Sequence, residues 1–160
     1  MLADTLTIRA TEAADLGAVK ELCIEAFTSG FEAEICGTIY ADNAVETISL
    51  VAVGPTGNIV GHVLLSEGNG PVRIALLGPL AVACDSREFG IGRTLVRHGL
   101  TAAKAAGFDA VFVRGASAYY GQFGFKSALA DAFESPYQGQ HFQALELVPG
   151  SLTGQTGAIA

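Results

Sequence analysis

The chain has 160 residues, of which 50% are hydrophobic and 16% are charged, and its net charge is −7 at pH 7. This balance is typical of a folded globular protein, excludes a largely disordered chain, and leaves no apolar run long enough to span a membrane. The acidic balance also argues against nucleic acid as a partner, because contacts to phosphate need a basic face.

The first half of the chain predicts a short strand, two helical segments and a hairpin. Apolar residues recur at helical spacing over residues 11–27, where Thr11 or Asp15 is the candidate N-cap. The turn sequence Pro55–Asn58 lies between two apolar runs, which is typical of a β-hairpin. The elements expected here are a strand at 4–11, helices at 11–27 and 29–42, and strands at 48–54 and 59–68.

The second half begins with an apolar run over residues 72–84 that contains Gly78 and Pro79. Because proline has no N–H to donate to a neighbouring strand, we expect a bulge or a splay of the sheet at this point. A helix with a buried apolar stripe is expected to follow and to end at Gly107 as its C-cap. The elements expected here are this helix at 93–107, a strand at 108–115, a helical turn or loop at 116–125, a short strand at 126–130 and a closing strand at 142–150.

This element order predicts the α/β class, with a mixed, partly antiparallel central sheet that is flanked by helices and splayed at its central strand. The length predicts one domain over residues 1–149, and residues 150–160 are expected to form a poorly ordered tail. The N-terminus has no basic region followed by an apolar core, so we expect no signal peptide. Cys23, Cys36 and Cys84 fit neither a disulfide framework nor a zinc site, which favours a cytoplasmic location and no metal.

The segment between the central apolar run and the long helix has the composition of an anion site. A strand that turns through glycines into a helix directs several backbone N–H groups at one point, where the helix dipole adds positive potential. Gly90 and Gly92 leave room for a ligand there, and Arg87 and Arg93 add positive charge. A plain helix start would have the same pattern. The sequence is not a Walker P-loop, since it has no Gly-Lys-Ser/Thr, and a Rossmann fingerprint would need a third glycine and an earlier place in the chain.

Two motifs taken together resemble the GNAT family of acyl-CoA-dependent N-acetyltransferases. The family pattern Q/R-x-x-G-x-G/A is met by Arg87–Gly92, and the pattern Y-x-x-x-G-F is met downstream by Tyr120–Phe125. The segment Gly115–Phe125 is most similar to the YhbS-like bacterial subgroup. The resemblance covers the order of elements from the first strand onward and the motifs between Leu77 and Phe125.

This resemblance implies acetyl-CoA as the acyl donor and assigns residues to it. The pantetheine arm would pair like an added strand with Leu80, Ala81 and Val82, at the edge that the predicted splay provides. The Leu80 amide would also donate to the acetyl carbonyl oxygen. The residues implied at the pyrophosphate are the backbone of Phe89, Gly90, Ile91, Gly92 and Arg93, together with Arg87 and Thr94. Glu88 and Phe89 depart from the family, because many relatives have a glycine and a basic residue at these two positions.

Acyl transfer to an amine needs an acceptor for the amine proton and a proton donor for the leaving thiolate. The resemblance implies Tyr120 as the acid, whereas the alternative is an aromatic residue of the core. Glu34, in the early helical segment that caps the acceptor cleft in such folds, and Glu67 are the candidate bases. A water relay, or an amine that arrives neutral, would need neither. His62 lies within an apolar run and is more typical of a half-buried structural histidine than of a catalyst.

The leading hypothesis is an acetyl-CoA-dependent N-acetyltransferase that moves the acetyl group directly from CoA to a primary amine. The alternative is a catalytically silent acyl-CoA-binding or regulatory domain of the same fold, which the missing base and Glu88 favour and Tyr120 disfavours. A small amine, an amino acid, an antibiotic and a protein lysine or N-terminus all fit as the acceptor. An exposed strand near the C-terminus could pair two chains in a homodimer.

Overall fold

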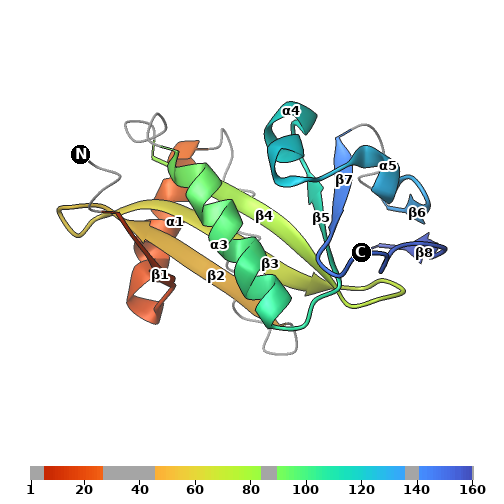
Figure 1. The fold of residues 1–160 in the computed structure, drawn as a ribbon. Helices are drawn as coiled ribbons and strands as arrows, with labels where there is room; N and C mark the ends of the chain where they lie inside the picture. Colours follow the sequence, from red (N-terminus) through yellow and green to blue (C-terminus); the bar gives the residue numbers. More distant parts are fainter. Residues whose placement is uncertain (1–5, 27–45, 84–89, 136–140, 160) are drawn as a thin grey trace. The chain divides into compact units, whose positions relative to one another are not determined.

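A computed structural model of the chain describes residues 6–26, 46–83, 90–135 and 141–159 (Figure 1). The helix expected at 29–42 lies outside the described residues, as do Glu34, Cys36, Cys84, Arg87, Glu88 and Phe89. The chain divides into two compact units. The first consists of Met1–Leu65 and Gly78–Gly99, and the second consists of Ser66–Leu77 and Leu100–Ala160.

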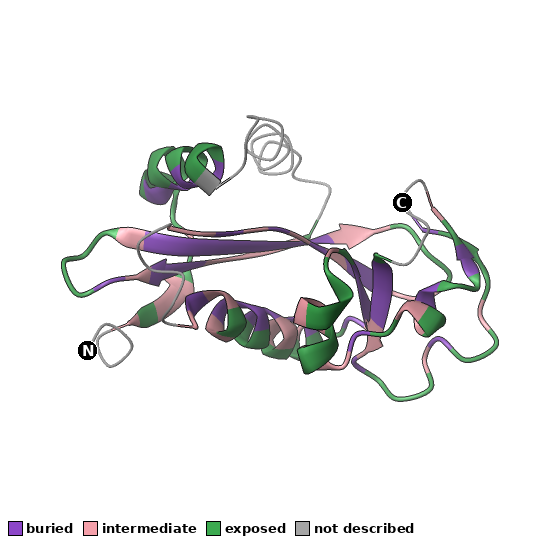
Figure 2. Ribbon diagram, turned by 90° about the horizontal axis from the view of Figure 1, so that it is seen from above, coloured by how far each residue is buried: buried purple, intermediate pink, exposed green. Residues whose placement is uncertain are grey.

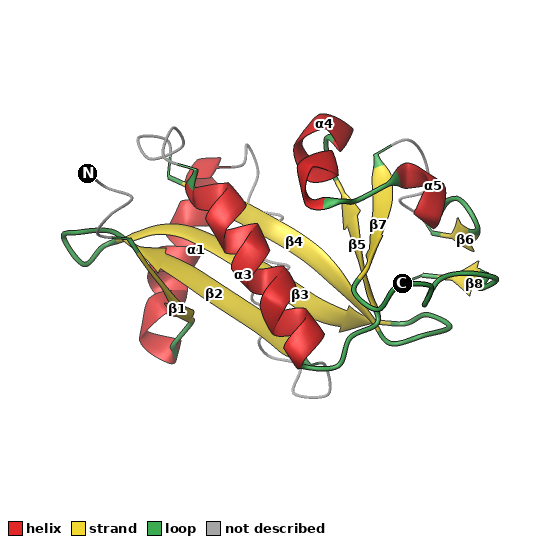
Figure 3. Cartoon of the chain, viewed as in Figure 1, coloured by secondary structure: helices red, strands yellow, loops and turns green. Residues whose placement is uncertain are grey.

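Within the described residues, six strands form a sheet in the order β1-β2-β3-β4-β5-β7 (Figure 3). β1 pairs with β2 and β5 pairs with β7 in antiparallel fashion, whereas β4 and β5 are parallel. The sheet is therefore mixed, which confirms the predicted α/β class. The strand bounds are β1 Thr7–Ala10, β2 Thr47–Val53, β3 Ile59–Gly68, β4 Ile74–Val82, β5 Ala110–Arg114 and β7 Phe142–Glu146.

The hairpin between β2 and β3 forms at the predicted turn. The Gly54 N–H donates to the Asn58 carbonyl at 2.8 Å, which closes the loop over Pro55–Asn58. Gly57 has a φ of +84°, a left-handed conformation that glycine adopts without steric cost. Local turn chemistry therefore sets this connection, as the sequence predicts.

In the first unit, α1 (Leu16–Ala26) lies on one face of the sheet and α3 (Ile91–Ala105) on the other (Figure 2). The side of α1 that faces the sheet is apolar and buried, and it belongs to a core cluster of Val19, Leu22, Cys23, Val51, Leu64 and Ala81.

The start of α3 packs on β3 through a glycine. A Cβ added at Gly61 would lie 2.8 Å from Leu95 and 2.9 Å from Ile91, which is closer than side chains can approach. Gly61 therefore allows α3 to lie directly on the strand, and the first turn of the helix is anchored there by Ile91.

The N-terminal cap of the first helical region differs from the prediction. Glu12, rather than Thr11 or Asp15, is the N-cap of a 3-10 turn, η2 (Ala13–Asp15), that leads into α1. The Asp15 carboxylate accepts a hydrogen bond from the Glu12 N–H at 2.7 Å, as in a capping box. Asp15 also pairs with the Arg9 guanidinium at 2.6 and 3.0 Å. The hydrogen bond from Arg9, followed by that from Glu12, lowers the pKa of Asp15 to about 2.

We expect Asp15→Asn to lower the Tm by about 2–4 °C at pH 7, because it removes the ion pair and weakens the cap. The folded-state pKa of about 2 lies below the ordinary value of 3.8, so the ionised carboxylate stabilises the fold at neutral pH. That contribution is lost as the pH falls from 3.8 through about 2. Thermal unfolding at pH 7 and near pH 2 measures it, with the exposed Glu21→Gln as control. A Tm difference that stays equal at both pH values would contradict the assignment.

β4 changes its pairing at the predicted point. Its first part pairs with β5 from Ile74 to Leu77, and the described pairing ends there, immediately before Gly78 and Pro79. Its last part stays with β3, since the Ala83 N–H donates to the Val60 carbonyl at 2.8 Å. The boundary between the two units falls at this same position. The structure thus confirms the splay that the proline predicts.

In the second unit, α3 ends where the sequence predicts. Gly107 has a φ of +93°, and the Phe108 N–H donates to the Ala103 carbonyl at 3.1 Å, as in a Schellman cap. The chain then continues through β5 into α4 (Ser117–Tyr120) and a 3-10 turn, η4 (Gly121–Phe123). Among the described residues, no helix is long and apolar enough to cross a membrane.

The prediction of a short strand at residues 126–130 is wrong. Lys126 forms an isolated bridge with Ala144, and the residues after it form α5 (Ser127–Ala130). A run of this length does not distinguish a strand from a helical turn by periodicity. Here Ala130 is buried in the core cluster, and its neighbour Leu129 packs against the same cluster. Adjacent residues of a strand would point to opposite faces, so this packing favours a helical turn.

The residues expected to form the C-terminal tail include a short strand. Residues 150–159 are described, and β8 (Gly157–Ala158) pairs in parallel with β6 (Phe133–Glu134). Leu152 and Ile159 are buried in a core cluster with aromatic residues of the second unit. Composition alone does not indicate the core in which these two apolar side chains are buried. The other members of this cluster are Ile74, Ala110, Phe112, Ala130, Phe133, Phe142 and Ala144.

Candidate functional site

The last part of β4 carries the residues expected to pair with the pantetheine arm. Ala81 is buried in the core beneath α1, whereas Leu80 and Val82 are half-buried, so side chains alternate along the strand. Leu80 lies three positions beyond the end of the described pairing with β5. Strand pairing with a ligand requires an edge of this kind.

The start of α3 has the geometry of an anion site. Gly90 has a φ of +68°, a left-handed conformation, and its carbonyl accepts hydrogen bonds from both the N–H and the hydroxyl of Thr94, at 3.1 and 3.0 Å. Ile91 is fully buried, so its side chain anchors the helix while its backbone stays at the turn. The first N–H groups of a helix have no intrahelical acceptors and carry positive potential. Arg93, which is exposed, adds a formal charge.

Tyr120 lies at the end of α4, in an aromatic cluster of the second unit. Its ring is 5.1 Å from that of Tyr119 and 5.8 Å from that of Phe125, both in edge-to-face geometry. Burial, followed by the charge of Tyr119, raises the pKa of Tyr120 to about 12. The phenol is therefore protonated at neutral pH and can donate a proton or a hydrogen bond.

The glycine of the Y-x-x-x-G-F motif is explained by its backbone conformation. Gly124 follows η4 with a φ of +100°, so it ends the 3-10 turn in a left-handed conformation. The next residue, Phe125, is 3% exposed and packs against Tyr120. The motif therefore corresponds to a turn in which Tyr120 precedes the 3-10 segment and Phe125 is buried after it.

The other titratable candidates have structural partners. Glu67 pairs with Arg73 at 3.3 Å, and both side chains are about one-third exposed. His62 is fully buried, deeper than predicted, and its Nε2 lies 3.0 Å from the Ser49 hydroxyl. Ser49 in turn donates to the Thr11 hydroxyl at 2.7 Å. Neither Glu67 nor His62 is brought into contact with a predicted site residue by these bonds.

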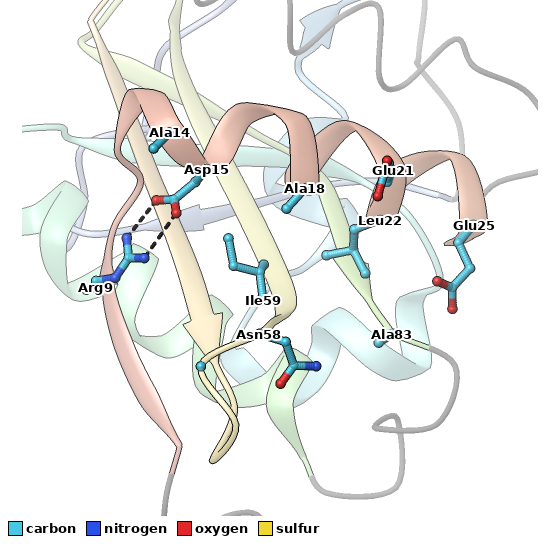
Figure 4. Close-up of a pocket in the computed structure, with 11 residues that line it drawn as sticks. Arg9, Ala14, Asp15, Ala18, Glu21, Leu22, Glu25, Asn58, Ile59 and Ala83 are labelled. Atoms are coloured by element: carbon cyan, nitrogen blue, oxygen red, sulfur yellow. Dashed lines mark hydrogen bonds and ion pairs between the residues drawn. The ribbon is translucent and has the colours of Figure 1, made fainter.

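A cavity of about 610 Å³ lies in the first unit beside α1 (Figure 4). The Arg9–Asp15 ion pair forms part of its wall, and the Glu21 and Glu25 carboxylates add negative charge. Among the described residues that line it, these carboxylates are unfavourable for a phosphate. Its lining residues are Arg9, Ala14, Asp15, Ala18, Glu21, Leu22, Glu25, Gly57, Asn58, Ile59 and Ala83.

The segment around Tyr120 is held by Gly115, the first residue of the stretch that resembles the YhbS-like subgroup, and by Gln143, which the sequence did not single out. Gly115 lies against the Tyr120 ring, and Gln143 bonds to the Gly115 carbonyl. Apart from that resemblance, their sequence signals are a glycine at the end of a strand and a glutamine within an apolar strand, and both are weak. Among the described residues, no group of three or more His, Cys, Asp or Glu side chains could hold a metal ion.

Comparisons with known proteins show the family and the fold of the chain. The model of the acetyltransferase (GNAT) family matches residues 17–125. The uncharacterized N-acetyltransferase YjhQ of Escherichia coli (strain K12) is 27% identical over 175 residues, which cover 96% of each chain. The crystal structure of YhbS from Escherichia coli in complex with CoA superposes with a TM-score of 0.91 at 28% identity, over 99% of this chain and 89% of that one. A GNAT-family acetyltransferase from Brucella melitensis in complex with acetyl-CoA has a TM-score of 0.80 at 28% identity, over 97% and 94% of the two chains.

Proposed function

Because the chain belongs to the acetyltransferase (GNAT) family, we propose that it moves an acetyl group directly from acetyl-CoA to a primary amine. The observation that carries this proposal is the likeness to YhbS, whose structure contains CoA, over nearly the whole chain. The ordered glycine turn at the start of α3 and the end of the β4–β5 pairing at Leu77 support it from within the structure.

The residues at the start of α3 fit a pyrophosphate. Backbone N–H groups of Gly90, Ile91, Gly92 and Arg93 would bind its oxygens, and the guanidinium of Arg93 would add charge. A Cβ at Gly90 would be strained at φ +68° and would lie 3.4 Å from the Arg93 guanidinium, so a side chain here would crowd the turn. Arg87, Phe89 and Thr94 remain members of the proposed cradle on the strength of the family pattern.

The last part of β4 would hold the pantetheine arm. We assign backbone pairing to Leu80, Ala81 and Val82, which follow the end of the described β4–β5 ladder. The Leu80 N–H would donate to the acetyl oxygen as negative charge develops on it. A donor on a strand is held rigidly, so little reorganisation is needed during the reaction.

Acetyl-CoA supplies an activated thioester, and the chain's residues manage the protons. Tyr120 would donate a hydrogen bond to the leaving sulfur, since its pKa of about 12 keeps the phenol protonated. An ordinary thiol has a pKa of about 8.5, so the phenol stabilises the developing thiolate mainly by this hydrogen bond. CoA leaves as a thiolate and takes up a proton from solvent, while the proton lost by the acceptor nitrogen passes to the base or to water, so no net proton is gained or lost.

Glu34 remains our candidate for the base. Glu67 is the weaker candidate, because its carboxylate already pairs with Arg73. A water relay or an amine that arrives neutral would serve in place of either residue. Two expectations belong to the same proposal: a cytoplasmic location, and a homodimer formed through an exposed strand near the C-terminus.

A screen of amines tests the proposal against the catalytically silent alternative. Purified protein is incubated with acetyl-CoA and a polyamine, an amino acid, an aminoglycoside or a peptide, and CoA release is followed with a chromogenic thiol reagent. We expect at least one amine to raise the rate about tenfold or more above the rate without acceptor, because transfer requires the nucleophile. Mass spectrometry should show one added acetyl group on that amine.

The matched control replaces the active amine by the alcohol of the same carbon skeleton, which should give no release above background. Saturable binding of acetyl-CoA without thiol release with any amine would contradict the proposal. That outcome would favour the acyl-CoA-binding or regulatory domain.

A further inference from the structure

The backbone of Gly115 forms one wall against the Tyr120 ring. A Cβ added at Gly115 would lie 2.9 Å from Tyr120 Cδ2 and closer still to Cε2. Real side chains do not approach so closely, so any other residue at 115 would displace the ring. The ring has little room to yield, because Tyr119 and Phe125 pack against it at centroid distances of 5.1 and 5.8 Å.

Gly115 is itself held by the segment that leads into β7. Its N–H donates to the His141 carbonyl at 2.9 Å, and its carbonyl accepts from the Gln143 side-chain amide at 3.1 Å. Gln143 lies on β7 opposite Val113 of β5, and it is 1% exposed. Burying an amide in an apolar core is unfavourable unless it is hydrogen-bonded. The hydrogen bond to the Gly115 carbonyl therefore offsets the cost of burying the Gln143 amide and fixes its orientation.

The same turn connects Gly115 to the backbone of Tyr120. The next residue, Ala116, accepts hydrogen bonds from the N–H groups of Tyr119 and Tyr120 at 3.1 and 3.0 Å. A continuous set of bonds thus leads from the buried amide on β7 through the glycine to the tyrosine.

We propose that Gly115 and Gln143 are positioning residues that hold the Tyr120 phenol in the orientation needed to donate to the leaving sulfur. This inference rests on the function proposed above. Glycine at 115 sets how close the ring lies to the backbone, and Gln143 fixes the backbone itself. The raised pKa of Tyr120 is consistent with a ring held in a partly buried position.

The test compares Gly115→Ala and Gln143→Met with the wild type. We expect kcat to fall about 10- to 100-fold in each, with the KM for acetyl-CoA unchanged, because a displaced acid slows chemistry without removing binding contacts. In the Tyr120→Phe background, Gly115→Ala should cause no further loss, since the group that it positions is already absent. Additive losses in that double variant would overturn the proposal.

A second readout does not depend on activity. Carbon-13 NMR of labelled tyrosine, with the Tyr120 signal identified by Tyr120→Phe, follows ionisation of the phenol up to about pH 10.5. The wild-type signal should stay protonated, whereas that of Gly115→Ala should begin to titrate as its ring moves toward solvent. An unchanged titration in both Gly115→Ala and Gln143→Met would overturn the proposal. If the wild type transfers acetyl to no amine, the proposed function fails, and this titration still decides whether the two residues hold the ring.

Gly121→Ala is the matched control. Gly121 lies next to Tyr120 with φ −57° and ψ −29°, and an added Cβ would meet no atom within 4 Å. Alanine fits this conformation, so kcat and the Tyr120 titration should stay at wild-type values. Gln143→Met keeps the side-chain volume while removing the amide, so it tests the same inference should Gly115→Ala fail to fold.

Discussion

Gly92→Glu is expected to abolish the thermal protection that acetyl-CoA confers on the wild type. Acetyl-CoA at about 100 times its Kd should stabilise the fold by about 2.7 kcal/mol, which raises the Tm by about 5–10 °C at this chain length. A glutamate in the first turn of α3 would place a negative charge at the proposed pyrophosphate cradle. Repulsion from two phosphate charges should weaken binding at least about 100-fold, so the shift disappears.

The fold itself should tolerate this change. A carboxylate in the first turn of a helix interacts favourably with the helix dipole, so the Tm without ligand should stay near that of the wild type. Gly92→Gln adds the same bulk without charge and should give an intermediate shift. Gly17→Glu is the control for position, because Gly17 lies exposed in α1 with no atom within 4 Å of an added Cβ. Full acetyl-CoA protection in Gly92→Glu, or equal protection of the wild type by NAD, would contradict the assignment.

Tyr120→Phe is expected to lower kcat by about 10²- to 10³-fold, the usual effect of removing one hydrogen-bond donor to a developing negative charge. The Kd of acetyl-CoA should change little, because phenylalanine keeps the edge-to-face contacts with Tyr119 and Phe125. Steady-state kinetics and calorimetric titration measure the two quantities. Since the pKa of about 12 lies far above neutrality and an acid acts below its pKa, Tyr120 should produce no alkaline fall in the wild-type rate up to about pH 10.

Tyr119→Phe is the matched control for the hydroxyl. Tyr119 has the same residue type one position away and packs on the same cluster, so its kcat should stay within about twofold of the wild type. A Tyr120→Phe variant with nearly full turnover would show that another group serves the thiolate. Collapse of acetyl-CoA binding in that variant would show that Tyr120 is structural.

The predictions that the structure confirms rest on chemistry between near neighbours in the sequence. The turn over Pro55–Asn58 and the helix end at Gly107 each depend on a few adjacent residues. The splay of β4 depends on the missing N–H of Pro79. The left-handed backbone of Gly90 and Gly124, which the sequence did not predict, is likewise a local feature that glycine adopts without steric cost. Such features can be read from the sequence because few alternative conformations compete with them.

The predictions that were wrong concern residues whose partners lie far along the chain. Residues 126–130 have no periodicity that distinguishes a strand from a helical turn. They form α5, in which Ala130 packs in a core cluster of the second unit. Composition likewise does not indicate that Leu152 and Ile159 are buried in one core cluster with Phe112 and other distant residues. The N-cap is a local exception: Asp15 lies inside the turn, and its carboxylate accepts the N–H of Glu12, three positions earlier.

The sequence by itself determined the α/β class, the family motifs and the candidate donor and cradle residues, because each depends on local spacing and residue type. Only the tertiary structure decided how Tyr120 is held. The bond between Gln143 and Gly115 joins residues 28 positions apart, and the close approach of Gly115 to the Tyr120 ring depends on the turn between them. Such contacts arise when strands pair and the core closes around them, so the physical reason for a glycine at 115 and a buried amide at 143 exists only in the folded chain.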